Sequence, residues 1–204
     1  AAGITPGEAV VEIGPGKGAL TKELLATGAQ VIAIEKDENL VAKLAESFKN
    51  DVASGCLMII RADIRDFEPA RLNLGGTYVL AANIPYYITG EIIRQFLGAE
   101  IQPRTMALLV QKEVAERIVA MDGKESILSL SVKAYGTPKI IAKVSRGNFS
   151  PPPSVDSAIL AITGISRAFF RTLDEKTFFK IVRAGFSSKR KLLAGNLAHS
   201  TGRL

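Results

Sequence analysis

The chain has 204 residues, of which 47% are hydrophobic and 23% are charged, and its formal net charge is +6. This length and composition suit one full-sized globular core with room for a small appendage. No apolar run approaches the roughly 18 residues that a membrane-spanning helix needs, and no signal-peptide pattern opens the chain. The positive charge suggests a polyanionic partner, although a basic enzyme without such a partner fits the charge equally well.

Histidine and cysteine are too scarce for several kinds of chemistry. Cys56 is the only cysteine and cannot form an internal disulfide, so we expect a cytoplasmic protein. His199 is the only histidine, and one histidine with one cysteine cannot make a zinc cluster of the usual type. The same scarcity argues against Ser-His-Asp and Cys-His nucleophilic catalysis. The sequence therefore predicts chemistry that needs neither a metal ion nor an imidazole.

A nucleotide-binding pattern lies near the start of the chain. Residues 9–13 form an apolar run typical of a buried strand, a glycine-rich segment follows at once, and leucines at helical spacing come next. Glycines let the backbone approach a ligand, and the free N–H groups at a helix start face it. The pattern Gly14-x-Gly16-x-x-Ala19 fits a dinucleotide site as well as a methyl-donor site. It predicts an adenosine-containing cofactor without identifying it.

Each of the next two predicted strands leads into a carboxylate. Residues 30–34 precede Glu35, and residues 57–60 precede Asp63. Because the carboxyl ends of parallel strands share one sheet edge, we expect both carboxylates to lie in one crevice with the glycine turn. Glu35 can hold ribose hydroxyls, or it can be a solvated carboxylate before a helix that Asp37 caps. Asp63 can accept a hydrogen bond from the amine of an adenine or cap a short helix, and the spacing leaves both open.

A fourth apolar strand, residues 78–82, ends at Asn83-Ile84-Pro85-Tyr86. An amide oxygen and a backbone carbonyl can both accept hydrogen bonds from an exocyclic amine, which keeps the nitrogen lone pair out of ring conjugation. No strong base is required, because the proton can leave after the nitrogen has become cationic. Tyr86 can stack on the base, a contact worth about 1–3 kcal/mol. We interpret the motif as a nucleobase clamp; the alternative is a strand-terminating turn with Pro85 as the stop signal.

The remaining segments complete an α/β pattern. Thr89 is expected to cap a helix, residues 105–110 form a fifth strand, and residues 126–135 favour a helix because their serines do not alternate strictly. Two further strands, residues 139–144 and 156–163, are joined by a proline-rich loop and should therefore be antiparallel. This order predicts an α/β fold with a seven-stranded, mostly parallel sheet. Phenylalanines among basic residues beyond the last strand indicate a short C-terminal helical appendage.

Four segments, taken in this order, resemble the ribosomal RNA adenine dimethyltransferases. These are the KsgA-like enzymes, whose erythromycin-resistance relatives modify large-subunit RNA. The segments are VEIGPGKGALT (11–21), NIPY (83–86), LVQKEVAER (109–117) and NFSPPPSVDS (148–157). The resemblance implies a Rossmann-like class I methyltransferase fold. It divides the chain into an S-adenosylmethionine-binding catalytic domain, residues 1–165, and a truncated helical RNA-binding domain, residues 166–204.

The resemblance also implies roles for individual residues. The residues that would bind the cofactor are Glu12, Gly14, Gly16, Glu35, Lys36, Asp63, Ile64 and Asn83. The residues that would hold the target adenine are Asn83, Ile84, Pro85, Tyr86 and Phe149. Tyr86 and Phe149 would cover the two faces of a flipped or single-stranded adenine, whose N6 is otherwise buried in pairing. Without the family, Phe149 would be interpreted as a loop anchor.

The tail of the chain is the candidate for holding RNA phosphates. Its basic residues are Arg183, Lys189, Arg190 and Lys191. The alternative interpretation of this tail is a solvated helix face.

The family usually carries an N-terminal segment that closes over the cofactor and a larger C-terminal domain. We therefore expect a trimmed form, and the sequence leaves open whether this form keeps full activity.

These observations predict S-adenosylmethionine-dependent dimethylation of adenine N6 in ribosomal RNA. The expected partner is the immature small ribosomal subunit, and the enzyme is expected to be a monomer that needs no metal and no membrane. The Phe149 loop and the Ile84 variant of the motif favour the small-subunit branch over the large-subunit, macrolide-resistance branch.

Three other classes fit part of the pattern. An NAD-dependent oxidoreductase shares the glycine turn and Glu35, but it leaves the motif at Asn83 unexplained. A DNA adenine methyltransferase shares the chemistry, but it usually has an acidic residue at the position of Asn83. A non-catalytic RNA-binding factor on a methyltransferase scaffold would bind RNA without transferring methyl groups.

Overall fold

The computed structural model describes residues 2–72, 74, 76–84, 86–188, 190 and 192–201, with the backbone alone for residues 199–201. Its strands form one sheet in the order β3-β2-β1-β4-β5-β7-β6. They are β1 (Ala9–Ile13), β2 (Gln30–Glu35), β3 (Leu57–Arg61), β4 (Val79–Asn83), β5 (Thr105–Gln111), β6 (Thr137–Val144) and β7 (Ser157–Thr163). β1 to β5 are parallel, and β7 is antiparallel to both β5 and β6. The predicted α/β sheet and its antiparallel final pair are confirmed.

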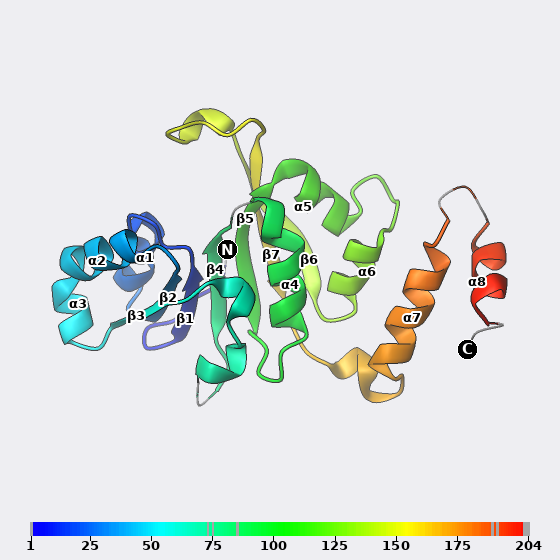
Figure 1. The fold of residues 1–204 in the computed structure, drawn as a ribbon, viewed down its shortest axis with the longest axis horizontal. Helices are drawn as coiled ribbons and strands as arrows, with labels where there is room; N and C mark the ends of the chain where they lie inside the picture. Colours follow the sequence, from blue (N-terminus) through cyan, green and yellow to red (C-terminus); the bar gives the residue numbers. More distant parts are fainter. Residues whose placement is uncertain are drawn as a thin grey trace.

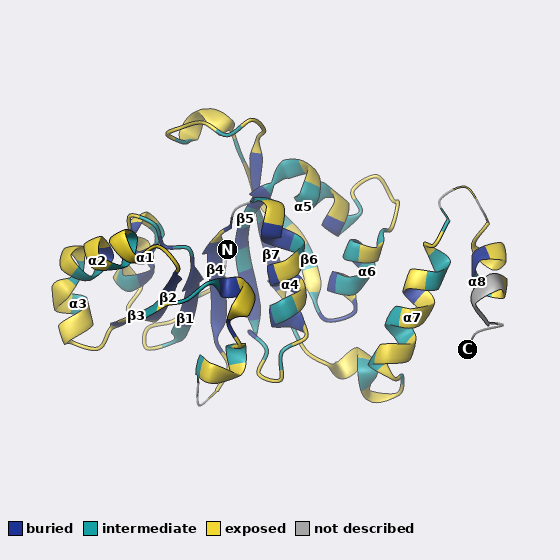
Figure 2. Ribbon diagram, viewed as in Figure 1, coloured by how far each residue is buried: buried dark blue, intermediate teal, exposed yellow. Residues whose placement is uncertain are grey.

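Helices cover both faces of the sheet (Figure 1). They are α1 (Ala19–Ala26), α2 (Glu38–Ser47), α3 (Lys49–Ala53), α4 (Thr89–Leu97), α5 (Lys112–Val119), α6 (Ile127–Lys133), α7 (Glu175–Gly185) and α8 (Leu193–Thr201). Alternation along β1 divides the core, because Val10 packs with Leu24 of α1 and Leu44 of α2. Val11 belongs instead to the cluster that includes α4, α5 and α6. Figure 2 shows the central strands β4, β5 and β7 buried between these partly exposed helices. In the described part of the chain, none of the helices is both long and apolar enough to cross a membrane.

The strand register brings the ends of several strands to one edge of the sheet. Parallel pairing places the carboxyl ends of β1 to β5 together. β6 ends at the same edge, because Gln111 of β5 and Val144 of β6 both pair with Ser157, the first residue of β7. The β6–β7 connection therefore leaves and re-enters the sheet at this edge, and Figure 1 shows it extending beyond the strands. The sequence segments that carry the predicted catalytic residues meet here.

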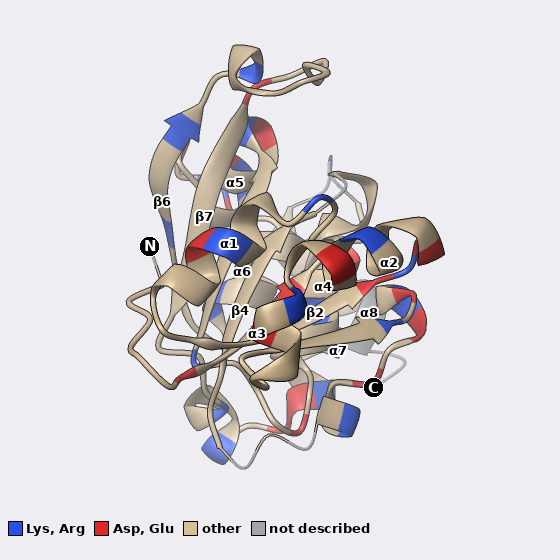
Figure 3. Ribbon diagram, turned by 90° about the vertical axis from the view of Figure 1, so that its left-hand side faces the viewer, with Lys and Arg blue, Asp and Glu red and all other residues tan. Residues whose placement is uncertain are grey.

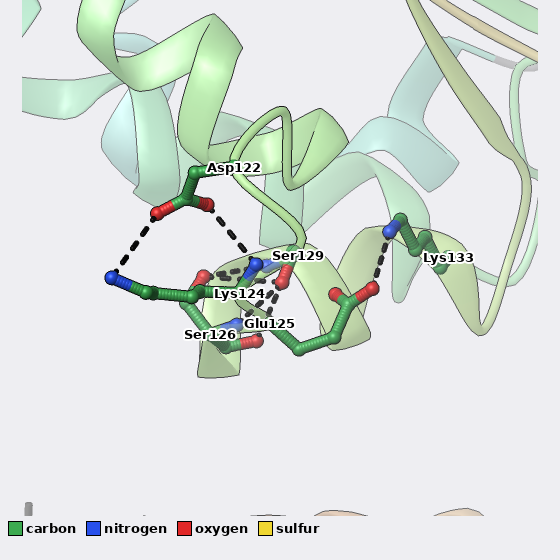
Figure 4. A network of polar contacts seen from close by, with 6 residues as sticks. All are labelled: Asp122, Lys124, Glu125, Ser126, Ser129 and Lys133. Atoms are coloured by element: carbon green, nitrogen blue, oxygen red, sulfur yellow. Dashed lines mark hydrogen bonds and ion pairs between the residues drawn. The ribbon is translucent and has the colours of Figure 1, made fainter.

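Ser126 decides the conformation of residues 126–135. Its hydroxyl accepts a hydrogen bond from the backbone N–H of Ser129 at 3.1 Å, and the Ser129 hydroxyl oxygen accepts one from the backbone N–H of Ser126 at 2.6 Å (Figure 4). This reciprocal pair is a capping box, which satisfies two free donors at a helix start. The predicted helix is confirmed as α6.

Thr89 does not cap α4, so this prediction was wrong. It is the first residue of the helix, the N-cap position is Ile88, and the Thr89 hydroxyl is buried without a hydrogen-bond partner in the described part of the chain. The cause is the 3₁₀ turn Tyr86–Ile88, which leads directly into α4. A residue that caps a helix with its side chain usually has an extended backbone, and no such residue separates this turn from the helix.

The C-terminal tail is helical and packs on the sheet domain through aromatic rings. The ring centroids of Tyr135 and Phe170 are 5.1 Å apart, as are those of Phe178 and Phe179. The Tyr135 hydroxyl also donates a hydrogen bond to Glu175 at the start of α7, at 2.6 Å. The predicted helical appendage is confirmed, whereas its separation as a domain at residue 166 stays a prediction.

Gly136, between α6 and β6, is a position where an added methyl group would collide with fixed backbone. A Cβ there would lie 2.9 Å from the carbonyl oxygen of Thr163 and 3.1 Å from a methyl group of Ile162. We expect Gly136→Ala to lower the free energy of unfolding in urea by about 1–3 kcal/mol, the usual cost of overpacking. Gly90→Ala is the matched control, because a Cβ at Gly90 meets nothing within 4 Å. Equal losses of stability in the two variants would contradict this explanation.

Candidate functional site

The turn between β1 and α1 has a backbone that glycine adopts most easily. Gly14, Gly16 and Gly18 have φ angles of 66°, 58° and 83°, in the left-handed region. The backbone N–H of Gly14 donates to the carbonyl of Ile34 at 3.0 Å, which ties the turn to β2. A Cβ on Gly16 would meet nothing within 4 Å, so this part of the turn faces open space. A ligand can therefore lie directly against the backbone at Gly16.

Glu35, at the end of β2, lies beside this turn. Its carboxylate accepts hydrogen bonds from the backbone N–H groups of Gly16 (3.3 Å), Lys36 (2.8 Å) and Asp37 (3.0 Å). Only 8% of Glu35 is exposed, so it is not a freely solvated carboxylate. The Lys36 side chain is exposed. Glu35 is thus fixed in place beside the glycine turn.

Glu12 is a carboxylate buried among the elements that support the turn. It lies on β1, is 1% exposed, and accepts a hydrogen bond from the Thr21 hydroxyl of α1 at 2.7 Å through Oε2. Its Oε1 is buried without a partner in the described part of the chain. Burial raises the pKa of Glu12 from 4.5 to about 7. Because an unpaired buried carboxylate is costly, a cationic ligand at this end of the turn would complete the site.

Asp63 acts as a cap in this structure. Its carboxylate accepts hydrogen bonds from the Arg65 backbone N–H at 3.0 Å and from Nε and Nη2 of the Arg65 guanidinium at 3.1 and 2.6 Å. These bonds hold the pKa of Asp63 well below its usual range. The capping role that the sequence left open is therefore present, and a contact with adenine stays a prediction. The neighbouring Ile64 is buried, and its carbonyl accepts a hydrogen bond from Gln95 of α4 at 2.9 Å.

The Asn83 motif lies next to the glycine turn. Asn83 is the exposed last residue of β4, and a Cβ on Gly14 would lie 3.7 Å from its carbonyl oxygen. Ile84 is buried in the core cluster, so its side chain points away from solvent and only its backbone can serve a ligand. Pro85 lies outside the described residues. Tyr86 is half-buried at the start of the 3₁₀ turn.

Three side chains that position the site were not predicted from the sequence. Ser157 is hydrogen bonded through Oγ to the Tyr86 hydroxyl at 2.7 Å, Gln95 contacts the Ile64 carbonyl, and Thr21 contacts Glu12. Thr21 and Ser157 lie inside segments that carry the family resemblance, but no local pattern gave either of them a role, and Gln95 lies outside those segments. Only the tertiary contact reveals them.

Phe149 lies on the expected edge of the sheet, but not against Tyr86. It is half-buried in the β6–β7 connection, just after the 3₁₀ turn Arg146–Asn148. No ring contact joins Phe149 to Tyr86 in the described part of the chain. The two-sided clamp is therefore not closed in this conformation.

Two of the four predicted RNA-binding residues are described by the structure, and they lie away from the crevice. Arg183 is exposed in α7, Arg190 is exposed beyond it, and Lys189 and Lys191 lie outside the described residues. Figure 1 shows α7 and α8 at the end of the molecule opposite α1 to α3. A groove of about 960 Å³ between α4, α6 and α7 is lined by apolar residues, by basic side chains and by Glu175. The basic residues are Arg94, Arg117, Lys176 and Arg183.

Charge is mixed on the opposite side of the molecule. Figure 3 shows acidic and basic residues side by side on α1 and α2. The excess positive charge is therefore not concentrated on this face. A search of the described residues finds no group of three or more His, Cys, Asp or Glu side chains that could hold a metal ion.

The raised pKa of Glu12 predicts a pH-dependent cost to stability. The folded state binds a proton more tightly than the unfolded chain, so the cost is absent below pH 4.5 and grows as the pH rises to about 7. We expect Glu12→Gln, which keeps the shape of the side chain, to raise the free energy of unfolding by about 2–3 kcal/mol at neutral to alkaline pH. The gain should disappear in acid. Urea unfolding across this pH range measures it.

Glu8 is the control with the opposite sign. Hydrogen bonds from Arg104 lower the pKa of Glu8 from 4.5 to about 2. Its contribution to stability is therefore present above pH 4.5 and is lost as the pH falls towards 2. Glu8→Gln should destabilise the protein at neutral pH and lose its effect on acidification. If both variants changed stability in the same direction at neutral pH, the assignment for Glu12 would be wrong.

Comparisons with known proteins identify the family of this chain. The family model described as ribosomal RNA adenine dimethylase matches residues 1–203. The protein named ribosomal RNA small subunit methyltransferase A from Dehalococcoides mccartyi is 46% identical over 204 residues, which are 99% of this chain and 69% of that protein. A crystal structure of a dimethyladenosine transferase from Plasmodium falciparum has a TM-score of 0.81 at 31% identity, covering 96% of this chain and 69% of that one. The 23S rRNA methyltransferase ErmE also has a TM-score of 0.81, at 26% identity, covering 97% of this chain and 78% of that one. As the four sequence segments predict, the chain belongs to the ribosomal RNA adenine dimethylase family.

Proposed function

We propose that this ribosomal RNA adenine dimethyltransferase uses S-adenosylmethionine and acts on adenine N6 in the RNA of the immature small ribosomal subunit. One observation carries the proposal: the Asn83 carbonyl lies against the glycine turn. A Cβ added to Gly14 would lie only 3.7 Å from the Asn83 carbonyl oxygen. A cofactor on the turn and a base at Asn83 would therefore be neighbours. The small-subunit assignment is supported by the 46% identity to a protein named for that activity.

The buried carboxylate of Glu12 favours this cofactor over NAD. Glu12 is buried, and one of its oxygens has no hydrogen-bond partner among the residues that the structure describes. Glu35 lies beside Gly16. Glu35 could hold the ribose of either cofactor, whereas the carboxylate of Glu12 would repel a diphosphate and suits a cationic group. S-adenosylmethionine has an ammonium, a sulfonium and a ribose, and when bound it supplies the methyl group. In the proposed arrangement Glu35 holds the ribose hydroxyls and Glu12 lies near the methionine end.

The base side of the crevice needs only acceptors and a stacking surface. The Asn83 side-chain oxygen and the backbone carbonyl after it would accept hydrogen bonds from the adenine amine. This orientation keeps the N6 lone pair available, and its proton leaves after the nitrogen has become cationic. Tyr86 would stack on one face of the base, and Phe149 on the other after the β6–β7 connection moves towards it. Asp63 and Ile64 would contact the adenine of the cofactor, with Lys36 beside them.

The tail would bind the RNA backbone. Arg183 is exposed and lines the groove between α4, α6 and α7, and Arg190 is exposed beyond α7. Guanidinium groups bind phosphate with paired hydrogen bonds and lose affinity as salt rises. A monomer that works in the cytoplasm, where ribosomal subunits are assembled, completes the proposal.

Methyl transfer to immature small ribosomal subunits, followed by mapping of the product, tests this function. We expect two methyl groups on N6 of each modified adenine, and calorimetry should detect S-adenosylhomocysteine binding without NAD binding. Products only on large-subunit RNA would favour the resistance branch. RNA binding without any methyl transfer would favour a non-catalytic factor.

The stacking residues should affect turnover more than cofactor affinity. Loss of one stacking surface, worth about 1–3 kcal/mol, predicts that Tyr86→Ala and Phe149→Ala each lower turnover about 10- to 100-fold. S-adenosylhomocysteine affinity, measured by calorimetry, should stay within about twofold. Tyr87→Ala is the matched control, because the Tyr87 ring is exposed beside Tyr86. If Tyr86→Ala abolished cofactor binding, the division of the crevice into two subsites would be wrong.

A further inference from the structure

The Tyr86 hydroxyl has a specific buried partner outside the Asn83 motif. It is 2.7 Å from the Oγ atom of Ser157, a residue 71 positions further along the chain. Ser157 is 0% exposed, whereas the Tyr86 side chain is only half-buried. The hydrogen bond therefore links a partly accessible ring to the rigid interior of the sheet.

Ser157 is held in place by the pairing of three strands. As the first residue of β7, it pairs with Gln111 of β5 on one side and with Val144 of β6 on the other. The residue before it, Asp156, accepts a hydrogen bond from the Lys112 backbone N–H at 3.0 Å through its carbonyl. The backbone on both sides of Ser157 is therefore fixed. Its hydroxyl is a stable reference point at the carboxyl edge of the sheet.

Asp156, the residue before Ser157, holds the two ends of the connection that carries Phe149. The Asp156 carboxylate accepts a hydrogen bond from the Arg146 backbone N–H at 3.0 Å, which ties the start of this connection to its end. Phe149 follows within three residues of Arg146. Tyr86 and the Phe149 connection are thus anchored to two consecutive residues, Ser157 and Asp156.

We propose that Ser157 is a positioning residue for methyl transfer, which sets the plane of the Tyr86 ring through their hydrogen bond. The proposal deepens the function above and rests on it for the role of Tyr86. A tyrosine ring that is held only at Cβ can rotate, and stacking weakens when its plane leaves that of the base. A second anchor at the hydroxyl leaves the ring one orientation before the base arrives. This pre-organisation would increase turnover without any contact between Ser157 and the base.

A purely structural role makes a different prediction. A buried serine hydroxyl needs a hydrogen-bond partner, and loss of that bond would then lower stability alone. Positioning predicts instead that turnover falls while the affinities for RNA and cofactor are kept. Removal of either hydroxyl, at Ser157 or at Tyr86, should also have the same effect, because each removal breaks the bond that holds the Tyr86 ring.

The test compares Ser157→Ala, Tyr86→Phe and the double variant of the full chain in single-turnover methyl transfer. We expect each single variant to lower the rate about three- to tenfold, the range for loss of one hydrogen bond. The double variant should be no slower than the slower single variant, because both remove one interaction. Ser157→Thr, which keeps the hydroxyl, should recover most of the rate. Additive losses, or an unchanged rate in Ser157→Ala, would overturn the inference.

A matched control separates stability from positioning. Ser129 is also fully buried and hydrogen bonded, but it belongs to the capping box of α6. Ser129→Ala should lower the thermal unfolding temperature and leave the methyl-transfer rate unchanged. If it slowed methyl transfer as much as Ser157→Ala does, the effect of Ser157 would be one of stability, and the inference would fail.

A stacking measurement decides the inference independently of methyl transfer. The chain has no tryptophan, so the fluorescence of a single-stranded RNA with a central 2-aminopurine reports the environment of the base without interference. The parent chain should quench it by stacking, Tyr86→Ala should not, and Ser157→Ala should quench it less at saturating protein. A parent that stacks the base without transferring methyl groups would sink the proposed function alone. Equal quenching by the parent and Ser157→Ala would sink the positioning role alone.

Discussion

The parallel pairing of β1 with β2 and β4 is the constraint on which the rest of the site depends. Glu12 pairs with Ala33 and with Ala81, and this register puts the ends of β2 and β4 on either side of the glycine turn. Glu35 and Asn83 therefore flank the same turn from opposite sides. A shift of one residue in either pairing would turn the side chains of that strand to the other face of the sheet. The crevice is thus fixed by backbone hydrogen bonds before any polar side chain contributes.

The edge of the sheet is divided between two tasks by the strand order. β1, β2 and β3 supply the glycine turn and the carboxylates, whereas β4, β5 and β7 surround the Asn83 motif. A strand parallel to β5 at the position of β7 would begin at the amino edge of the sheet, away from the crevice. The antiparallel β7 instead inserts between β5 and β6 and starts at the carboxyl edge. This reversal brings Ser157 within reach of Tyr86.

Local patterns were sufficient to predict most of the fold and the motifs, but not the contacts that connect them. The strands, the cap at Asp37 and the helix after Ser126 follow from hydrophobic period and capping chemistry, which are local. The prediction that Thr89 caps α4 failed because the turn before Thr89 is helical. The conformation of this turn depends on the burial of Ile84 and Ile88, which is a tertiary effect. Ser157 and Gln95 could not be predicted, because each acts on a residue more than 30 positions away. Tertiary contacts of this kind leave no periodic signal.

The buried carboxylate of Glu12 shows how stability and function are opposed at this site. One of its oxygens has a partner in Thr21 and the other has none among the described residues, and burial raises its pKa to about 7. A glutamine would fill the same space without the cost of ionisation, so packing alone does not explain a carboxylate here. A cationic ligand above the turn would both pair the free oxygen and favour the ionised form. Ligand binding would then offset the cost of this buried carboxylate to stability, which is the pattern expected of a residue kept for binding.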